Sequence, residues 1–319
     1  MISLTESSQA LFARRWSHLQ DPHVRALAWL LDAPDLLDPA APQWGGLIAS
    51  LGPHCGEQAA EWLSRLDAAP TEFHARLGLG ATPRLGRYAE KLIATYFAQQ
   101  GTLVAHGLQV QAGKSATIGE FDFLLREGAT LLHWEFATKF YLLEGSGAGQ
   151  AADYFVGPNL ADTLGAKMGK ILHRQLALGQ HPAAQTYLPQ PISRAQALVK
   201  GWLFYHPDQT LLDNDIGLHP QHCRGFWCAL NEWHAAADQA CLRLERLDWL
   251  APASVQSEQC CTADQLRTEL AAHFAHDSMP VLVALLADRG GKHIEIERGF
   301  IVPNDWRERA GQRRLQQIN

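Results

Sequence analysis

Two neighbouring stretches of the sequence decide the fold: Gly119-Glu-Phe-Asp-Phe-Leu-Leu125 and Leu132-His-Trp-Glu-Phe-Ala-Thr-Lys-Phe140. Both are rich in the apolar and aromatic residues typical of buried strands, and the turn Glu127-Gly128 between them predicts a β-hairpin. Side chains alternate between the two faces of a strand, so one apolar set is expected to pack together against helices in a core. Its members are Phe121, Phe123, Leu125, Trp134, Phe136 and Phe140.

Charged residues interrupt the same two strands. Glu120 and Asp122 share one face of the first strand, and Glu135 and Lys139 share one face of the second. Burying a lone charge is costly, whereas two carboxylates that converge on a divalent cation are no longer left to repel each other. Oxygen ligands of this kind suit Mg²⁺ or Mn²⁺. Lys139 is then placed beside the ion, where it can orient a water molecule or neutralise charge that develops on a phosphate.

The hairpin belongs to a longer order of predicted elements. Apolar periodicity predicts a helix that ends at Gly101, three strands, a second helix and a further buried strand. Their expected ranges are 85–99 for the first helix, 103–110, 118–126 and 130–143 for the strands, 160–178 for the second helix and 197–205 for the last strand.

This order, with Asp122 in the second strand and Glu135 followed by Lys139 in the third, resembles the PD-(D/E)XK nuclease superfamily. The resemblance implies an α/β protein with a restriction-endonuclease-like αβββαβ core. It also implies Mg²⁺-dependent hydrolysis of phosphodiester bonds in nucleic acid, with DNA a better candidate than RNA. More narrowly, GEFDFLL, WEFATKFYL and RGFIVPNDW resemble an uncharacterised bacterial family that is placed in this superfamily.

Residue by residue, the resemblance implies that Asp122 and Glu135 bind the metal, that Lys139 is the catalytic lysine and that Glu90 is an additional acidic group. The chain departs from the superfamily pattern in one respect. One residue usually separates the acid from the lysine, but here three do, and Ala137 occupies the expected lysine position. Lys139 is displaced by two residues, about 6.6 Å of strand rise, much of which a lysine side chain can span.

Each residue also has a structural interpretation. The two carboxylates could form an ion pair with Lys139 or Arg126, and Glu90 could pair with its helical neighbours Arg87 or Lys91. The corresponding alternative function is a catalytically degraded nuclease fold that acts as a nucleic-acid-binding or protein-binding scaffold.

Three cations follow one face of the second predicted helix. Lys167, Lys170 and Arg174 are spaced at i, i+3 and i+7 and are candidates for contacts with phosphates. A solvated cationic face is the alternative.

A glycine-rich loop, Gly145-Ser-Gly-Ala-Gly149, follows the third strand. The third glycine of a dinucleotide-binding fingerprint would fall at Gln150, so we interpret the segment as a loop flanking the mouth of the site.

Charge is divided unevenly along the chain. Residues 80–206 hold eleven Lys and Arg against eight Asp and Glu, an excess of three positive charges, while the remainder holds sixteen against twenty-five.

No apolar run is long enough to span a membrane, and no secretory signal is visible, so a cytoplasmic protein is expected. The six cysteines match no zinc pattern and are expected to be free thiols. The expected parts are a helical N-terminal segment at 1–75, a nuclease-like core at 76–206 and an α/β extension at 207–319.

Overall fold

The computed structural model describes residues 6–52, 55–78, 84–112, 116–145, 152–209 and 216–318, with side chains up to residue 313. The helices are α1 (Ser8–Trp16), α2 (Pro22–Asp32), α3 (Glu57–Ala68), α4 (Thr71–Leu77), α5 (Leu85–Gln99), α6 (Leu164–Lys170), α7 (Ala263–Phe274) and α8 (Trp306–Ile318). The strands are β1 (Leu103–Ala112), β2 (Ala116–Glu127), β3 (Thr130–Leu143), β4 (Phe155–Val156), β5 (Ile192–Tyr205), β6 (Cys223–Ala229), β7 (Ala240–Arg243), β8 (Ser254–Gln256), β9 (Cys261–Thr262), β10 (Val281–Asp288) and β11 (Lys292–Val302). A mixed α/β architecture, as predicted, is confirmed.

One large mixed sheet runs through the molecule, in the order β1-β2-β3-β5-β6-β11-β10-β7-β9, with β4 beside β3 and β8 beside β11. The first three strands form an antiparallel meander, and β5 then joins β3 in parallel. The parallel pairs β5–β6 and β6–β11 carry the sheet on into the last third of the chain. The strands expected at 103–110, 118–126 and 130–143 are therefore present, and the sheet extends well beyond them.

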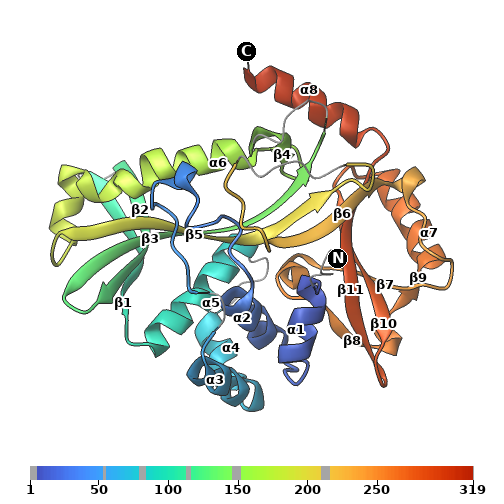
Figure 1. The fold of residues 1–319 in the computed structure, drawn as a ribbon, viewed down its shortest axis with the longest axis horizontal. Coiled ribbons are helices and arrows are strands. Elements are labelled where there is room, and N and C mark those ends of the chain that lie inside the picture. The colour runs from blue at the N-terminus through green and yellow to red at the C-terminus, as the bar shows by residue number, and fades with distance from the viewer. Residues whose placement is uncertain are drawn as a thin grey trace.

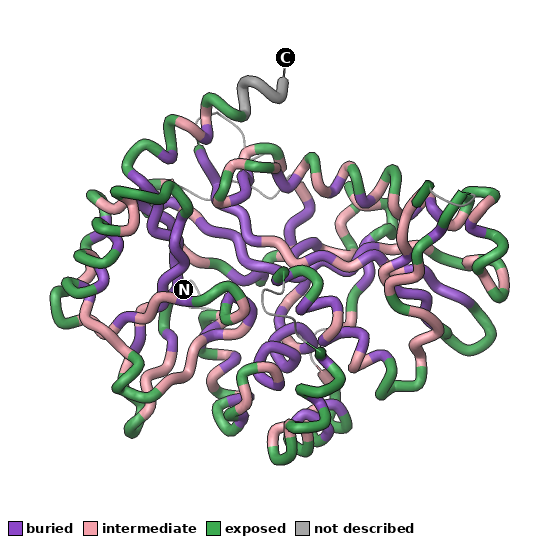
Figure 2. Tube along the Cα trace, turned by 180° about the vertical axis from the view of Figure 1, so that it is seen from behind, coloured by how far each residue is buried: buried purple, intermediate pink, exposed green. Residues whose placement is uncertain are grey.

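Helices cover both faces of this sheet. Figure 1 shows α6 on one side and α1, α2 and α5 on the other. The predicted apolar face of α5 is buried, and the helix ends before Gly101, whose φ of +68° an L side chain rarely adopts. Figure 2 shows buried residues running along the central strands, between the two helical layers.

All six cysteines are free thiols, as predicted, and three of them are buried.

The second predicted helix, expected at 160–178, has a more complex form. It begins as α6, continues as a π-helical turn over Ile171–Gln175 and ends as a 3₁₀ helix over Leu176–Gln180. The π turn changes the angular spacing of the side chains, so the i, i+3, i+7 rule does not describe one straight face through it. Its buried residues, including Met168 and Ile171, pack against Tyr141 of β3.

The expectation that Phe121 and Phe123 share one face of β2 is wrong. Phe123 packs in the cluster beneath α5, whereas Phe121 packs with Val110 and Leu178 on the other side. The paired residues of β2 and β3 run from Glu127↔Thr130 to Phe123↔Trp134. Regular alternation breaks at Asp122, immediately beyond the last of these pairs, and this is where the candidate site lies.

Candidate active site

The candidate site lies where β2 and β3 separate. Oδ2 of Asp122 accepts a hydrogen bond from the backbone N–H of Phe136 at 2.9 Å, so a carboxylate satisfies a strand amide beside the end of the ladder. Beyond this point β3 remains paired with β5 and meets β4 only at Leu142 and Leu143. The intervening stretch of β3, residues 135–141, thus has one edge turned toward the site.

Three carboxylates converge at this separation. One oxygen each from Glu90 of α5 and from Glu120 and Asp122 of β2 lie within 4.8 Å of one another. Opposite ligands of an octahedral Mg²⁺ ion are about 4.2 Å apart, because each metal–oxygen bond is about 2.1 Å long. Adjacent ligands are about 3.0 Å apart, so the donor set has the chemistry of a hard-cation site, and its oxygens would move closer together to bind one ion.

Two basic side chains contact this acidic cluster, defined as Glu90, Glu120 and Asp122. Nη1 of Arg87 lies 2.7 Å from Glu120 and 3.3 Å from Glu90. Nε2 of His106, on β1, lies 2.8 Å from Glu90. The hydrogen bond from Arg87 lowers the pKa of Glu120, against a smaller opposing effect of burial. Part of the acidic charge is therefore already neutralised by the chain itself.

The acidity of Asp122 is strongly perturbed. Burial raises its pKa to about 7, helped by the negative charges of Glu135, Glu90 and Glu120 and opposed by the hydrogen bond from Phe136. A carboxyl group in this state holds a proton near neutral pH unless a cation takes the proton's place.

Glu135 lies beside Asp122 but is held mainly from the α6 side of the sheet. Its exposed fraction is 2%, and it hydrogen-bonds the buried His133 at 2.7 Å and the Gln175 amide of the π turn. Burial raises the pKa of Glu135 to about 7, and hydrogen bonding from Asp122 opposes the shift. Burial also lowers the pKa of His133 to about 4, which leaves the imidazole neutral near pH 7.

Lys139 lies farther along β3, in a pocket of about 520 Å³ that is also lined by the start of α5. Burial lowers the pKa of its ammonium group to about 8, with the nearby Lys167 acting in the same direction and Asp162 and Asp122 in the other. Its backbone is fixed by the parallel partner Gly201, where an added Cβ would lie 2.0 Å from the Lys139 carbonyl oxygen. Glycine at this position allows the two strands to approach.

The structure brings some of the predicted site residues together and separates others. Glu90 and Asp122 are in the cluster, Glu135 is adjacent and Lys139 lines the pocket. Of the three cations predicted on the second helix, Lys167 lines the same pocket and pairs with Asp162 at 3.3 Å, whereas Lys170 and Arg174 are exposed. Most of the predicted glycine loop, residues 146–149, lies outside the described residues.

Sequence reasoning missed several neighbours of the site: His106 on the acidic cluster, His133 and Gln175 on Glu135, and Arg84, Asp162 and Arg246 in the pocket. The i, i+3 spacing of Arg87 and Glu90 did signal their ion pair. The sequence carries no comparable signal for Gln175 or Arg246, which reach the site through the tertiary fold.

The sequence model of a family described as a domain of unknown function, DUF1853, matches residues 25–302. The chain belongs to the DUF1853 family. The predicted resemblance to an uncharacterised family is thereby confirmed over most of the chain. Comparison with curated proteins finds no match, and comparison with solved structures finds none either. Among the described residues, no helix is long and apolar enough to cross a membrane.

Proposed function

We propose that this DUF1853 protein is a divalent-metal-dependent phosphodiesterase that acts on nucleic acid, with DNA the preferred substrate over RNA. The observation that carries the proposal is the convergence of Glu90, Glu120 and Asp122 at the separation of β2 and β3. Carboxylates gathered at such a place repel one another. The pKa of Asp122 is raised first by burial and then by the negative charges of Glu135, Glu90 and Glu120.

Glu90, Glu120 and Asp122 would hold the ion, with Glu135 as a further ligand within reach of Asp122. When bound, Mg²⁺ or Mn²⁺ supplies an activated water and neutralises charge on the phosphate. Before it binds, Asp122 must release the proton that its raised pKa retains. His133 and Gln175 fix the Glu135 carboxylate, so this side chain is already ordered for its role.

Lys139 is proposed to hold a phosphate oxygen near the acidic cluster. Its ammonium group interacts electrostatically with Asp122 and lines the pocket that opens on the same strand edge. With a pKa of about 8 the group remains mostly protonated at pH 7, as charge stabilisation requires.

A noncatalytic scaffold is the alternative, and one observation favours it. Arg87 already bonds both Glu120 and Glu90, in the manner of a structural ion-pair network that needs no metal. Under this alternative the chain keeps the fold and binds nucleic acid or protein without hydrolysing either. The two proposals differ in whether the acidic cluster binds a divalent cation.

The test combines metal binding with cleavage. Mn²⁺ binding is measured by calorimetry, and cleavage of duplex DNA, single-stranded DNA and RNA is followed with Mg²⁺, with Mn²⁺ and with chelator. The variants are Asp122→Asn and Glu90→Gln, and the control is Glu127→Gln, which removes an exposed carboxylate from the far end of β2. We expect cleavage that needs metal and is lost in both site variants but kept in the control. Metal binding without cleavage, or cleavage that survives Asp122→Asn, would overturn the proposal, and absence of metal binding would favour the scaffold.

A further inference from the structure

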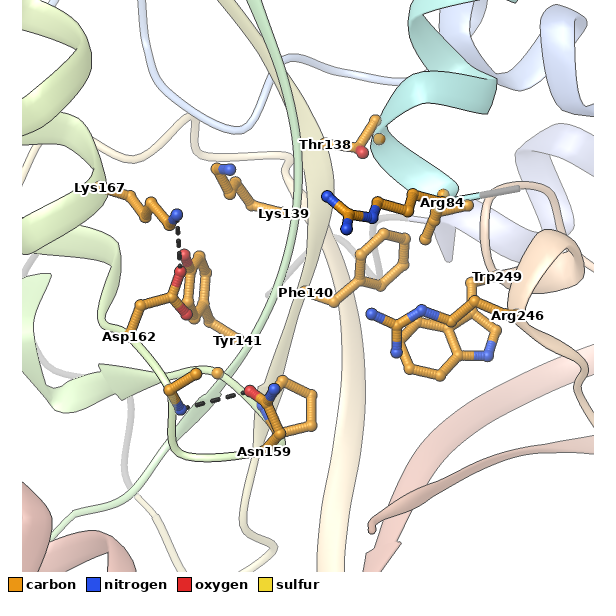
Figure 3. Close-up of a pocket in the computed structure, with 15 residues that line it drawn as sticks. Arg84, Thr138, Lys139, Phe140, Tyr141, Asn159, Asp162, Lys167, Arg246 and Trp249 are labelled. Atoms are coloured by element: carbon orange, nitrogen blue, oxygen red, sulfur yellow. Dashed lines mark hydrogen bonds and ion pairs between the residues drawn. The ribbon is translucent and has the colours of Figure 1, made fainter. Parts of the chain in front are cut away.

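The pocket beside Lys139 has the composition of an anion site. It lies at the exposed edge of β3, between the N-terminus of α5 and the segment 157–162, and Figure 3 shows side chains from several elements turned toward it. Its charged lining residues are Arg84, Lys139, Lys167, Arg246 and Asp162. Four cations against one carboxylate leave an excess of three positive charges.

Two of these cations, Arg84 and Arg246, have no counter-charge in the part of the chain that the structure describes, where their side chains make neither a hydrogen bond nor an ion pair. Lys139 differs, because the negative charges of Asp162 and Asp122 act on its ammonium group. Asp162 is already engaged, because it pairs with Lys167 and hydrogen-bonds Tyr141. Crowding like charges without partners costs free energy, and a bound anion would remove that cost.

The groups around the pocket are also held in place. The Arg246 guanidinium stacks on the buried Trp249 ring at 4.1 Å, which leaves its N–H edges available for hydrogen bonds. Arg84 is the N-cap residue of the fifteen-residue helix α5 and provides no side-chain cap, so the first amides of that helix remain available as well. Figure 3 shows the Arg84 and Arg246 side chains on the same side of the strand, whereas Lys139 and Lys167 lie on the other.

We propose that this pocket binds the phosphomonoester group of a nucleotide. A phosphomonoester carries a charge of about −1.5 to −2 at pH 7, which suits the two unpartnered guanidinium groups of Arg84 and Arg246 better than the single charge of a phosphodiester does. Guanidinium groups and helix-terminal amides both suit its oxygens. A volume of about 520 Å³ accommodates the remainder of one nucleotide. The ligand can be a free nucleotide or the phosphorylated end of a strand, because both present the same group.

The inference goes beyond the proposed cleavage, and its test is independent of it. Binding of adenosine 5′-monophosphate, adenosine and inorganic phosphate is measured by calorimetry on the full chain in chelator, so that neither metal nor cleavage contributes. We expect the monophosphate to bind, adenosine to bind at least tenfold more weakly, and the affinity for the monophosphate to fall as salt rises. Equal binding of adenosine and its monophosphate, or no binding of the monophosphate, would overturn the proposal.

Arg84→Gln and Arg246→Gln test the residues. Each variant is expected to weaken monophosphate binding about tenfold or more, while Arg65→Gln, which removes an equally positive and exposed side chain from α3, leaves it unchanged. Equal thermal stability of the three variants ensures that the comparison reports on binding. An unchanged affinity in both pocket variants would refute the assignment. A 5′-phosphorylated dinucleotide and its 5′-hydroxyl counterpart show whether the ligand is a free nucleotide or the phosphorylated end of a strand. A strand end is the natural ligand only if the phosphorylated dinucleotide binds at least as tightly as the free nucleotide.

Discussion

The Asp122 carboxylate accepts a hydrogen bond from the backbone N–H of Phe136, with 2.9 Å between Oδ2 and N. The bond lies immediately beyond the last paired residues of β2 and β3. One carboxylate thus does two things: one oxygen satisfies the amide of the neighbouring strand, while the group also faces two other acids. Replacement by alanine would leave that amide without its acceptor, at a cost of about 1–3 kcal/mol. Asparagine keeps an acceptor oxygen and is therefore the cleaner variant for separating charge from structure.

The charge of Asp122 is predicted to make stability depend on pH. Its pKa is raised to about 7 from an ordinary value of 3.8, so between these values the folded chain binds more protons than the unfolded chain. The stabilising contribution is complete below about pH 4 and is lost as pH rises through 7. Denaturant unfolding is measured at about pH 5 and about pH 8, without metal. Between these values the free energy of unfolding of the wild type should fall by about 1–3 kcal/mol relative to that of Asp122→Asn. Glu127→Gln should show no such gain, and a pH-independent difference between wild type and Asp122→Asn would contradict the raised pKa.

Metal affinity is predicted to depend on the same protons. Asp122 and Glu135 both have pKa values raised to about 7, and each must be deprotonated to act as a ligand. Mn²⁺ affinity should therefore fall steeply below pH 7 and level off above pH 8, with proton release on binding visible as a buffer-dependent heat in calorimetry. Asp122→Asn should release fewer protons. Wild-type affinity that is flat between pH 6 and 8 would show that neither group binds the ion.

The meander and α5 could be predicted from sequence because their signals are local. Turn residues, alternation and apolar periodicity placed the helix at 85–99, as observed, and placed the third strand at 130–143, as observed. The break at Asp122 could not be predicted in this way, because it depends on how two strands diverge in space. Gln175 lies forty residues from Glu135 in sequence and reaches it only through the π turn that replaced the expected regular helix. Local patterns therefore predicted the carboxylates but not the groups that hold them.

Arg87 is predicted to compete with the metal. Its guanidinium bonds Glu120 and Glu90, and the cluster gives up these contacts when a cation arrives. Arg87→Gln should therefore raise Mn²⁺ affinity by about tenfold, equivalent to about 1.4 kcal/mol. Without metal the same variant should melt at a lower temperature, since the carboxylates lose their neutralising partner. Arg76→Gln breaks an exposed pair with Glu72 on α4 and serves as the control. A drop in Mn²⁺ affinity in Arg87→Gln would instead assign Arg87 a supporting role in binding.

Gly201 is predicted to be indispensable for the position of Lys139. An added Cβ would lie 2.0 Å from the Lys139 carbonyl oxygen, so the central strands would have to move apart. We expect Gly201→Ala to lower the free energy of unfolding by about 3 kcal/mol, the upper end of what overpacked core substitutions usually cost. Gly169→Ala on α6, where no atom lies within 4 Å of the added Cβ, should be neutral or stabilising. Equal stability of the two variants in denaturant unfolding would show that β3 and β5 do not require this close approach.

The cations of the second helix give the last prediction, which concerns the path of the nucleic acid. If Lys167, Lys170 and Arg174 contact phosphates, replacing all three by Gln should weaken binding similarly for different sequences, because phosphate contacts do not read bases. The slope of log affinity against log salt should become shallower by about 0.9 for each lost duplex contact. Lys167 is paired with Asp162 and faces the pocket, whereas Lys170 and Arg174 are exposed. The double variant of Lys170 and Arg174 should therefore account for most of the change in slope, and Lys167→Gln alone for little of it. An unchanged slope in the triple variant would mean that this helix is merely solvated, and that the substrate reaches the acidic cluster along another surface.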